Sequence, residues 1–206
     1  MIGIIDYGMG NLGSVLNAFR FLELDAKIVT TRQELDDCRA LVLPGVGAFG
    51  DCMAHLVEHG FVGAIGQWIA AGKPFMGICL GLQALFESSE ESPGIPGLGI
   101  FPGTVKRFML PKELKVPQIG WNRMEQIRSE CPMFQGIDNG TFFYLVHSYY
   151  VAPTDEAIVA GKTEYGIDYC SCIWEDNVYA VQFHPEKSGN EGQKIIDNFL
   201  FFTYSL

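Results

Sequence analysis

Short apolar runs alternate with segments of helical periodicity through the first half of the chain. The runs at residues 2–5, 26–30 and 40–43 have the length and composition of buried strands, and residues 12–22 place apolar side chains at helical spacing. Strands that alternate with helices in this way are typical of parallel βαβ units. The pattern therefore predicts an α/β fold whose central sheet is open, mostly parallel and flanked by helices.

Two more helices and a sharp strand-to-helix turn follow along the chain. Residues 49–58 and 61–71 have helical periodicity, and the short apolar run at residues 74–78 predicts an interior parallel strand. Helical spacing then resumes at Leu80 and reaches Glu87. The sequence therefore predicts a buried strand that turns directly into a helix.

The second half of the chain is richer in strands. A turn-rich segment at residues 88–97 separates it from the parallel half and is interpreted as a loop within one domain. The elements expected beyond it are strands at residues 105–108, 141–151, 157–164, 169–174 and 178–183 and an amphipathic helix at residues 191–202. We expect these strands to be antiparallel additions to the sheet. A chain of 206 residues suits a single domain spanning residues 1–206.

Composition and charge exclude several classes of protein. With 48% hydrophobic and 18% charged residues, the chain has the composition of a folded globular protein. The net charge of −10 argues against a general nucleic-acid or anionic membrane surface, because both require clustered Lys and Arg. No apolar run reaches the ~18 residues of a membrane helix, and the chain begins on a predicted strand. Six cysteines in a chain of this size do not make a disulfide scaffold, so we expect a cytoplasmic protein.

Cys79 lies at the joint between the predicted strand and helix, with Gly77 and Gly81 two residues away on either side. This is the arrangement of a nucleophile elbow, in which the backbone comes too close for side chains at the flanking positions. The N–H groups at a helix start favour the thiolate form of such a cysteine. His184 and Glu186 follow the last predicted strand and suit the roles of base and orienter. Cys79 alone is equally compatible with an inert core thiol, but the three residues together predict a Cys-His-Glu triad.

Two further motifs do not lead to a cofactor site. The segment at residues 8–13 matches the glycine pattern of dinucleotide-binding loops directly after a strand. The next strand ends in Thr30 and Thr31, where an acidic residue would hold the ribose, so we interpret the glycines as a tight turn. Cys170 and Cys172 alternate along a strand with both thiols on one side. With no second cysteine pair nearby, we interpret them as core residues.

A third motif suggests zinc. His55, Glu58 and His59 spell the H-x-x-E-H pattern of a zinc peptidase class, and Cys52 lies on the same helical face. No downstream acidic helix offers a further ligand, so we interpret this segment as a solvated amphipathic helix and expect no metal.

The segments Gly77-Ile78-Cys79-Leu80-Gly81 and Gln182-Phe183-His184-Pro185-Glu186 resemble the two signatures of class I glutamine amidotransferase domains. Those domains have a flavodoxin-like open α/β sheet, and their Cys, His and Glu hydrolyse glutamine to glutamate and ammonia. Further matches are Ile5-Asp6-Tyr7-Gly8-Met9-Gly10-Asn11-Leu12, Pro44-Gly45-Val46-Gly47-Ala48-Phe49-Gly50, Gly120-Trp121-Asn122 and Val146-His147-Ser148-Tyr149. The set is similar to the branch that forms the glutaminase subunit of imidazole glycerol phosphate synthase in histidine biosynthesis.

The resemblance implies roles for further residues. Backbone N–H groups of Val46, Gly47 and Leu80 would form the oxyanion hole that stabilises the tetrahedral intermediate. The residues that would hold the amino and carboxylate ends of glutamine, partly through backbone groups, are Gly45, Gln83, Glu91, Ser148 and Tyr149. This chemistry requires no cofactor and no metal.

The resemblance also implies a partner, because ammonia released into neutral water becomes ammonium and loses its nucleophilicity. The resembled subunit forms a heterodimer with a (β/α)8 barrel cyclase, and no nucleic acid or membrane is involved. The implied interface positions are Asn11, Trp121, Asn122, Tyr144 and Lys187. Two alternatives stay open at this point. One is a paralogous glutaminase that feeds another synthase, for example one that modifies a sugar, and the other is a catalytically silent scaffold that only stabilises a partner.

Overall fold

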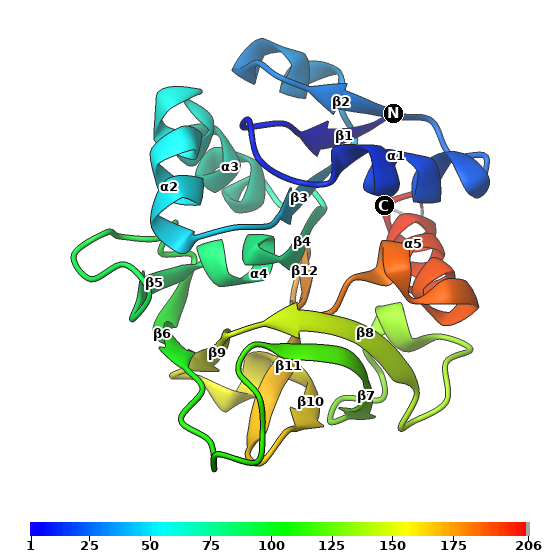
Figure 1. Cartoon of the computed structure of the whole chain (residues 1–206). Coiled ribbons are helices and arrows are strands. Elements are labelled where there is room, and N and C mark those ends of the chain that lie inside the picture. The colour runs from blue at the N-terminus through cyan, green and yellow to red at the C-terminus, as the bar shows by residue number, and fades with distance from the viewer. Residues whose placement is uncertain (205–206) are drawn as a thin grey trace.

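The first half of the chain forms parallel βα units in the order that the hydrophobic pattern predicts. A computed structural model describes residues 1–204 (Figure 1). Strands β1, β3 and β4 are buried along their whole length, as expected of parallel strands covered on both faces. The elements of this half are β1 (Ile2–Ile5), α1 (Leu12–Phe21), β2 (Ala26–Val29), a 3-10 turn (Arg32–Asp37), β3 (Ala40–Gly45), α2 (Phe49–Glu58), α3 (Phe61–Ala70) and β4 (Phe75–Cys79).

The second half contributes mainly short strands and one long helix. Its helices are α4 (Leu80–Ala84) and α5 (Gly189–Tyr204), with 3-10 turns at Pro132–Phe134, Glu156–Ile158 and Pro185–Lys187. Its strands are β5 (Phe86–Ser89), β6 (Phe101–Arg107), β7 (Gln118–Gln126), β8 (Phe142–His147), β9 (Tyr149–Pro153), β10 (Val159–Glu164), β11 (Asp168–Glu175) and β12 (Val178–Val181).

One 12-stranded sheet runs through the molecule in the order β2-β1-β3-β4-β12-β11-β10-β7-β8. The pairs from β2 to β12 are parallel, and the pairs from β12 to β8 are antiparallel. β9 pairs with β11 and β6, and β6 also pairs with β5. The predicted mixture of a parallel sheet and additional antiparallel strands is confirmed. The insertion of β12 beside β4 joins two segments that are far apart in sequence.

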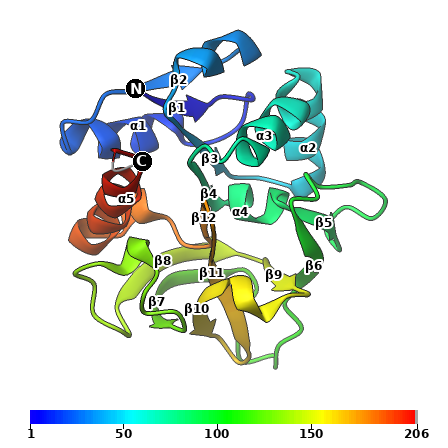
Figure 2. The same ribbon diagram turned by 180° about the vertical axis from the view of Figure 1, so that it is seen from behind.

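Helices cover both faces of the parallel half, while the strand-rich half extends away from it (Figures 1 and 2). α1 and α5 bury apolar side chains on one face, and α2, α3 and α4 bury theirs on the other. On the first face these include Val15, Phe19, Ile195 and Phe199, and on the second Phe49, Leu56, Ile65 and Leu80. α1, α2 and α3 each bury only one face, so their amphipathic pattern in the sequence was informative, whereas α4 is buried along its whole length.

The helix after Cys79 is shorter than predicted. α4 ends at Ala84, and Glu87 lies in strand β5. Leu98 N donates to the Ala84 carbonyl at 2.8 Å and Ile100 N donates to the Leu85 carbonyl at 2.9 Å. These long-range bonds take the carbonyl groups that would continue the helix, so the helical spacing up to Glu87 was misleading.

The structure divides one predicted strand and adds one strand that was not predicted. The strand expected at residues 141–151 is divided at Ser148, because β8 pairs with β7 whereas β9 pairs with β6 and β11. β7 was not predicted at all. Much of β7 is half-buried or exposed, so its apolar alternation is weak.

The prediction that Cys170 and Cys172 share one side of their strand was wrong. The register between β10 and β11 shifts at Gly161, which pairs with Cys172, while the next residue of β10, Lys162, pairs with Cys170. A bulge of this kind breaks the two-residue repeat of a strand. The two buried thiols therefore pack in different core clusters. Their interpretation as core residues is confirmed.

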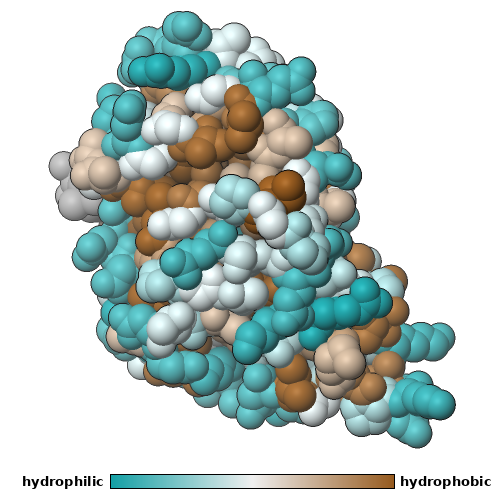
Figure 3. Space-filling view, turned by 90° about the vertical axis from the view of Figure 1, so that its left-hand side faces the viewer, coloured by the Kyte–Doolittle hydropathy of each residue, from teal (hydrophilic) through white to brown (hydrophobic). Residues whose placement is uncertain are grey.

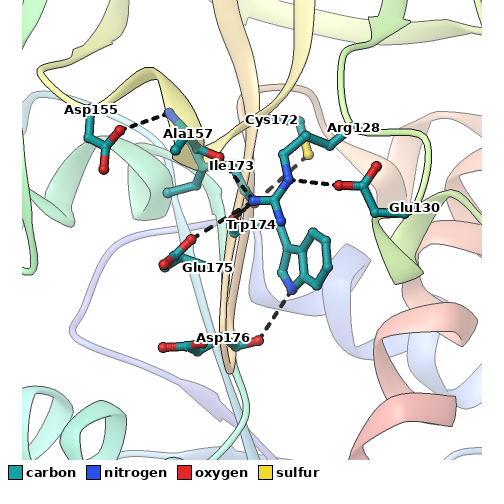
Figure 4. Close-up of polar contacts among 9 residues, drawn as sticks. All are labelled: Arg128, Glu130, Asp155, Ala157, Cys172, Ile173, Trp174, Glu175 and Asp176. Atoms are coloured by element: carbon teal, nitrogen blue, oxygen red, sulfur yellow. Dashed lines mark hydrogen bonds and ion pairs between the residues drawn. The ribbon is translucent and has the colours of Figure 1, made fainter.

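Arg128 joins the segment after β7 to β11 and to the turn before β10 (Figure 4). Its Nη1 donates to the Ala157 carbonyl at 3.0 Å and to the Trp174 carbonyl at 2.9 Å. Its Nε donates to Glu130 Oε1 at 3.1 Å, and its guanidinium lies 4.2 Å from the centre of the Trp174 ring. One side chain thus links three segments of the strand-rich half.

Polar and apolar side chains are mixed on the side of the molecule that carries α2 (Figure 3). The exposed apolar residues include Val57 of α2, which is 66% exposed. Within residues 1–204, the helices are all too short or too polar to cross a membrane.

Candidate active site

β4 ends at Cys79, where the chain turns sharply into α4. Cys79 has a φ of 55°, a left-handed value that residues with side chains rarely adopt. A Cβ at Gly77 would lie 2.8 Å from the Gly81 carbonyl oxygen, and a Cβ at Gly81 would collide with the Leu43 carbonyl oxygen. Both positions therefore require glycine, as the nucleophile-elbow pattern predicts.

The thiol of Cys79 has a neighbouring hydrogen-bond donor. Gln182 Nε2 lies 3.6 Å from Cys79 Sγ. Gln83 Nε2 donates to Gln182 Oε1 at 3.1 Å, which orients the Gln182 amide with its NH2 group toward the sulfur. All three side chains are buried, so water does not compete for these bonds. The sulfur is therefore held in place by a buried amide donor.

His184 follows β12, and the parallel pairing of β12 with β4 brings it to the same edge of the sheet as Cys79. His184 Nδ1 lies 2.8 Å from Glu186 Oε1, and the two side chains are 3% and 2% exposed. Burial by itself lowers the pKa of His184. The proximity of Cys79 and the hydrogen-bonded carboxylate of Glu186 outweigh burial and raise this pKa to about 10. His184 is therefore protonated at neutral pH.

The second ring nitrogen of His184 is available for proton transfer. His184 Nε2 is buried and has no partner with hydrogen-bond geometry among residues 1–204. Because Nδ1 is held by Glu186, Nε2 is the atom that can exchange a proton with Cys79 or with a bound substrate.

A cavity of about 300 Å³ opens over these groups. Its lining combines the expected nucleophile and base with the expected oxyanion residues and most of the expected glutamine contacts. The lining residues are Val46, Gly47, Cys79, Leu80, Gln83, Glu91, Pro117, Val146, His147, Ser148, Tyr149 and His184. Of the other expected residues, Gly45 pairs with Cys79 in the β3–β4 ladder, and Glu186 bonds to His184. The structure thus brings together residues from segments that are widely separated in the chain.

Internal hydrogen bonds restrict what two of these side chains can offer a ligand. Gln83 Nε2 donates to the Tyr149 carbonyl at 3.0 Å as well as to Gln182 Oε1. Both amide hydrogens of Gln83 are therefore used, and its Oε1 can act only as an acceptor. Glu91 Oε2 accepts from the Phe49 N–H at the start of α2, at 2.8 Å. The other carboxylate oxygen of Glu91 is left for a ligand.

The expected oxyanion residues lie on two sides of the nucleophile. Leu80 directly follows Cys79, and Val46 and Gly47 directly follow β3. Gly47 has a φ of 102°, which is accessible mainly to glycine. Because Gly47 has no side chain, the backbone after β3 can rotate there and reorient its N–H groups.

The chain matches known proteins over nearly its whole length. A family model described as class I glutamine amidotransferase matches residues 3–202. The chain is 48% identical to the imidazole glycerol phosphate synthase subunit HisH of Syntrophotalea carbinolica, over 97% of this chain and 98% of the relative. It is 49% identical to the subunit of the same name from Methanocaldococcus jannaschii, over 97% of this chain and 98% of the relative. The chain belongs to the HisH branch of the class I glutamine amidotransferases.

Solved structures share the fold of this glutamine amidotransferase at low sequence identity. A structure of PurLQS from Thermotoga maritima has a TM-score of 0.78 at 19% identity, over 98% of this chain and 97% of that chain. A structure described as a glutamine amidotransferase has a TM-score of 0.77 at 20% identity, over 98% of both chains. The mixed sheet with flanking helices is thus the fold of the family.

Three of the residues expected at the partner interface of this HisH relative form one exposed group. Trp121 of β7 pairs with Tyr144 of β8, and their rings meet edge to face at 6.2 Å. Lys187 Nζ lies 5.8 Å from the centre of the Tyr144 ring. Trp121 is 55% exposed, which is unusual for so large an apolar side chain.

The two expected interface asparagines have hydrogen bonds within the chain. Asn122 Nδ2 donates to the Glu164 carbonyl at 2.7 Å and so ties β7 to the end of β10. Asn11 Oδ1 accepts from Ser14 N at 3.3 Å and caps α1. These side chains therefore have structural roles, whether or not a partner also contacts them.

Sequence reasoning missed two buried polar residues of the site. Gln182 stands two residues before His184, at the end of the strand predicted from the sequence, and the two-residue repeat of that strand would place both on one face, although β12 itself ends at Val181. That repeat was the signal that would have identified Gln182. His147 lines the cavity, and its ring bonds to the Tyr149 carbonyl at 2.8 Å and to the Tyr169 hydroxyl at 3.2 Å. Its burial could not be read from the sequence, because it depends on the break between β8 and β9.

Proposed function

We propose that the chain is the glutaminase subunit of an imidazole glycerol phosphate synthase and that Cys79, His184 and Glu186 hydrolyse glutamine. The HisH relatives support the first part of this proposal, because they match almost end to end. The observation that carries the second part is the buried pair of His184 and Glu186 beside Cys79 in one cavity. A nucleophile, a base and an orienting carboxylate in one place weigh against a catalytically silent scaffold.

The first half-reaction forms a thioester. The Cys79 thiolate attacks the side-chain carbonyl carbon of glutamine, and the carbonyl oxygen becomes an oxyanion near the N–H groups of Val46, Gly47 and Leu80. Protonated His184 then gives its Nε2 proton to the amide nitrogen, the C–N bond breaks, and ammonia leaves. Glu186 stays ionised and stabilises the imidazolium before the transfer.

The second half-reaction releases glutamate. Neutral His184 takes a proton from a water molecule, which attacks the thioester carbonyl carbon. The same N–H groups stabilise the second oxyanion, and collapse breaks the C–S bond. Glutamate leaves with the new oxygen, and Cys79 returns to the thiolate beside protonated His184.

The free hydrogen-bonding groups of the cavity suit the amino-acid end of glutamine. Gln83 Oε1 and the free oxygen of Glu91 are acceptors and fit the α-ammonium group. Backbone groups of Ser148 and Tyr149, at the break between β8 and β9, are the candidates for the α-carboxylate. An amide lacking the α-ammonium group would leave Glu91 without a counter-charge, so we expect such amides to be poor substrates.

The ammonia is delivered to a (β/α)8 barrel cyclase subunit. Free ammonia would be protonated in water at neutral pH, so the active site must open onto a partner rather than onto solvent. The exposed group formed by Trp121, Tyr144 and Lys187 is the candidate docking surface, because Lys187 directly follows the triad residue Glu186. A large exposed aromatic residue beside a charge is typical of an interface hot spot.

The experiment that tests this function is Cys79→Ser in a complex with the histidine-pathway cyclase. We expect glutamine-dependent synthesis of imidazole glycerol phosphate to be lost, while synthesis from added ammonium salt continues, because only ammonia generation uses the thiol. Synthesis with each nitrogen source is measured for the wild-type and variant complexes.

Three other outcomes are informative. Equal loss with both nitrogen sources would contradict the role of Cys79. Glutaminase activity that rises with another synthase but not with this cyclase would favour the paralogue. A wild-type chain that produces no glutamate in any complex would favour the scaffold.

A further inference from the structure

A group of side chains on α2 has no part in the chemistry proposed above. Glu58 is the last residue of α2 and His59 is its C-cap, and they follow His55 by three and four residues, so helix geometry places both beside His55. One ligand atom from each of these residues lies within 4.8 Å of the other two. His55 is half-buried, whereas Glu58 and His59 are exposed. The group is thus open to solvent on one side and anchored on the other.

Both imidazole rings are oriented by hydrogen bonds to backbone carbonyl groups. His55 Nδ1 lies 2.9 Å from the Tyr7 carbonyl oxygen, and His59 Nδ1 lies 2.9 Å from the His55 carbonyl oxygen. A carbonyl oxygen can only accept, so each neutral ring carries its proton on Nδ1 and a lone pair on Nε2. The rings are stacked, with centroids 6.3 Å apart and planes 11° apart. A carbonyl acceptor behind each ring is the usual support of a metal-binding histidine.

We propose that His55 Nε2, His59 Nε2 and a carboxylate oxygen of Glu58 bind one Zn²⁺ ion, with water as the fourth ligand. Two imidazoles and one carboxylate form a common zinc ligand set, whereas Ca²⁺ and Mg²⁺ prefer sites made entirely of oxygen atoms. One nitrogen of each ring and one carboxylate oxygen already lie within 4.8 Å of one another, so the three side chains can reach a common point.

The structure changes the ligand set that sequence reasoning considered. Cys52 is buried, and burial raises the pKa of its thiol to about 11, so it is protonated and turned away from solvent. Glu58 supplies the third ligand from the same helix. The absence of an acidic residue on a later helix therefore does not argue against a metal.

A bound ion would link α2 to the turn after β1. His55 contacts this turn through the Tyr7 carbonyl, and a Cβ at Gly8 would lie 3.1 Å from His55 Nδ1. Gly8 has a φ of 88°, and its N–H donates to Asp6 Oδ1 at 2.8 Å. Metal binding at Nε2 would fix the His55 ring, and the ring would in turn hold this tight turn through the Tyr7 carbonyl. We expect zinc to raise the melting temperature of the chain.

The test uses the full chain carrying Cys79→Ser, because the active-site thiol and His184 can themselves attract zinc. Equilibrium dialysis against buffered Zn²⁺ should give one ion per chain. Adding His59→Ala should weaken binding on the order of a hundredfold, since a direct ligand matters at least as much as an outer partner. His59 is exposed, so this variant is expected to fold.

A matched pair of charge changes separates coordination from general electrostatic attraction. Glu58→Gln and Glu113→Gln each remove one exposed carboxylate, but Glu113 lies in the segment between β6 and β7. We expect Glu58→Gln to weaken zinc binding and to abolish most of the zinc-dependent rise in melting temperature. Glu113→Gln should leave both unchanged.

Co²⁺ provides a spectroscopic check on the ligands. The Cys79→Ser chain should show the visible bands of tetrahedral cobalt without a thiolate-to-metal charge-transfer band, and His59→Ala should lose them. The proposal is overturned by a thiolate band, by zinc binding that His59→Ala leaves unchanged, or by absence of saturable zinc binding in the Cys79→Ser chain. None of these measurements depends on glutaminase activity, so their outcome is separate from that of the proposed function.

Discussion

At the scale of single residues, the environment of the proposed nucleophile Cys79 depends on distant side chains as well as on the start of a helix. α4 is only five residues long, so the sequence-based emphasis on a helix N-terminus is incomplete. Gln182 donates toward Cys79 Sγ, and protonated His184 provides a nearby positive charge. Gln83 in turn orients Gln182. The reactivity of Cys79 is therefore shared among residues that come from different elements.

Gln182→Leu tests this positioning role. Loss of the donor should slow alkylation of Cys79 by iodoacetamide at neutral pH by on the order of tenfold, since a hydrogen bond to a charged group is worth about 1.5–3 kcal/mol. Gln118→Leu is the matched control, because Gln118 is equally buried but bonds to the Tyr169 hydroxyl. A similar slowing of alkylation in both variants would contradict the role of Gln182.

His147 should make the fold sensitive to acid. Burial lowers the pKa of His147 to about 4, while hydrogen bonding to the Tyr149 carbonyl opposes this effect. Between the ordinary pKa of histidine, about 6.5, and this lower value, the unfolded chain binds more protons than the folded chain, so stability falls as pH falls. Over that interval His147 should contribute a loss of about 3 kcal/mol in the free energy of unfolding.

The measurement is urea denaturation of the wild type and of His147→Gln at several pH values. Glutamine keeps polar groups at this position but does not titrate. The free energy of unfolding of His147→Gln should therefore fall less on acidification than that of the wild type. Curves that stay parallel from about pH 7 to about pH 4 would show that His147 does not titrate with unfolding.

At the scale of elements, the strand-rich half is held by contacts between segments rather than by regular helices. β7 is a mostly polar strand, and Asn122 and Arg128 connect it and its C-terminal extension to β10 and β11. Arg128 is half-buried and satisfies carbonyl groups of Ala157 and Trp174 while stacking on the Trp174 ring. Only the planar guanidinium group of arginine, with its several N–H donors, can make these contacts at the same time.

Arg128→Lys should destabilise the fold although it keeps the charge. Lysine cannot reach the two carbonyl groups, Glu130 and the indole face together, so we expect a loss of about 1–3 kcal/mol in the free energy of unfolding. Thermal and urea denaturation measure this loss. Arg32→Lys, at an exposed position in the 3-10 turn after β2, is the matched control and should be close to neutral. Equal losses in the free energy of unfolding for the two variants would contradict this structural role of Arg128.

At the scale of the whole molecule, the active site lies where the parallel half meets the strand-rich half. The proposed nucleophile Cys79 ends β4, the proposed base His184 follows β12, and the segment between β8 and β9 closes the other side of the cavity. The expected oxyanion segment after β3 lies at the surface, with Val46 38% exposed and Gly47 in a left-handed conformation. A glycine-containing surface segment is able to hold its N–H groups toward or away from the oxyanion.

We predict that the isolated chain is a slow glutaminase and becomes fast only when the cyclase is docked and holds its nucleotide. If docking favours inward N–H groups by ~3 to 4 kcal/mol, the shift in population alone raises turnover by about two to three powers of ten. Glutamate release is measured for the chain alone, with the cyclase, and with the cyclase plus nucleotide. Equal rates in the three conditions would indicate an oxyanion hole that is already formed.

The sequence by itself determined the elements whose signals are local. The strands and helices of the parallel half and the elbow at Cys79 follow from apolar periodicity and glycine spacing within short windows, and residue chemistry in the same windows predicts the Cys-His-Glu triad. The predicted α2 and the closing helix were found for the same reason, because an amphipathic pattern reports which face a helix buries. Family resemblance added the positions expected to bind glutamine and a partner, and most of the glutamine positions line one cavity.

Only the tertiary structure decided how these pieces meet. Pairing of β12 with β4 brings His184 to Cys79, and long-range bonds end α4 at Ala84 and divide the predicted strand at Ser148. The same assembly places Gln182 against the thiol and Arg128 across three segments. These features depend on contacts between residues far apart in the chain. Such contacts do not change the hydrophobic periodicity of either contacting segment, so no local sequence pattern could have predicted them.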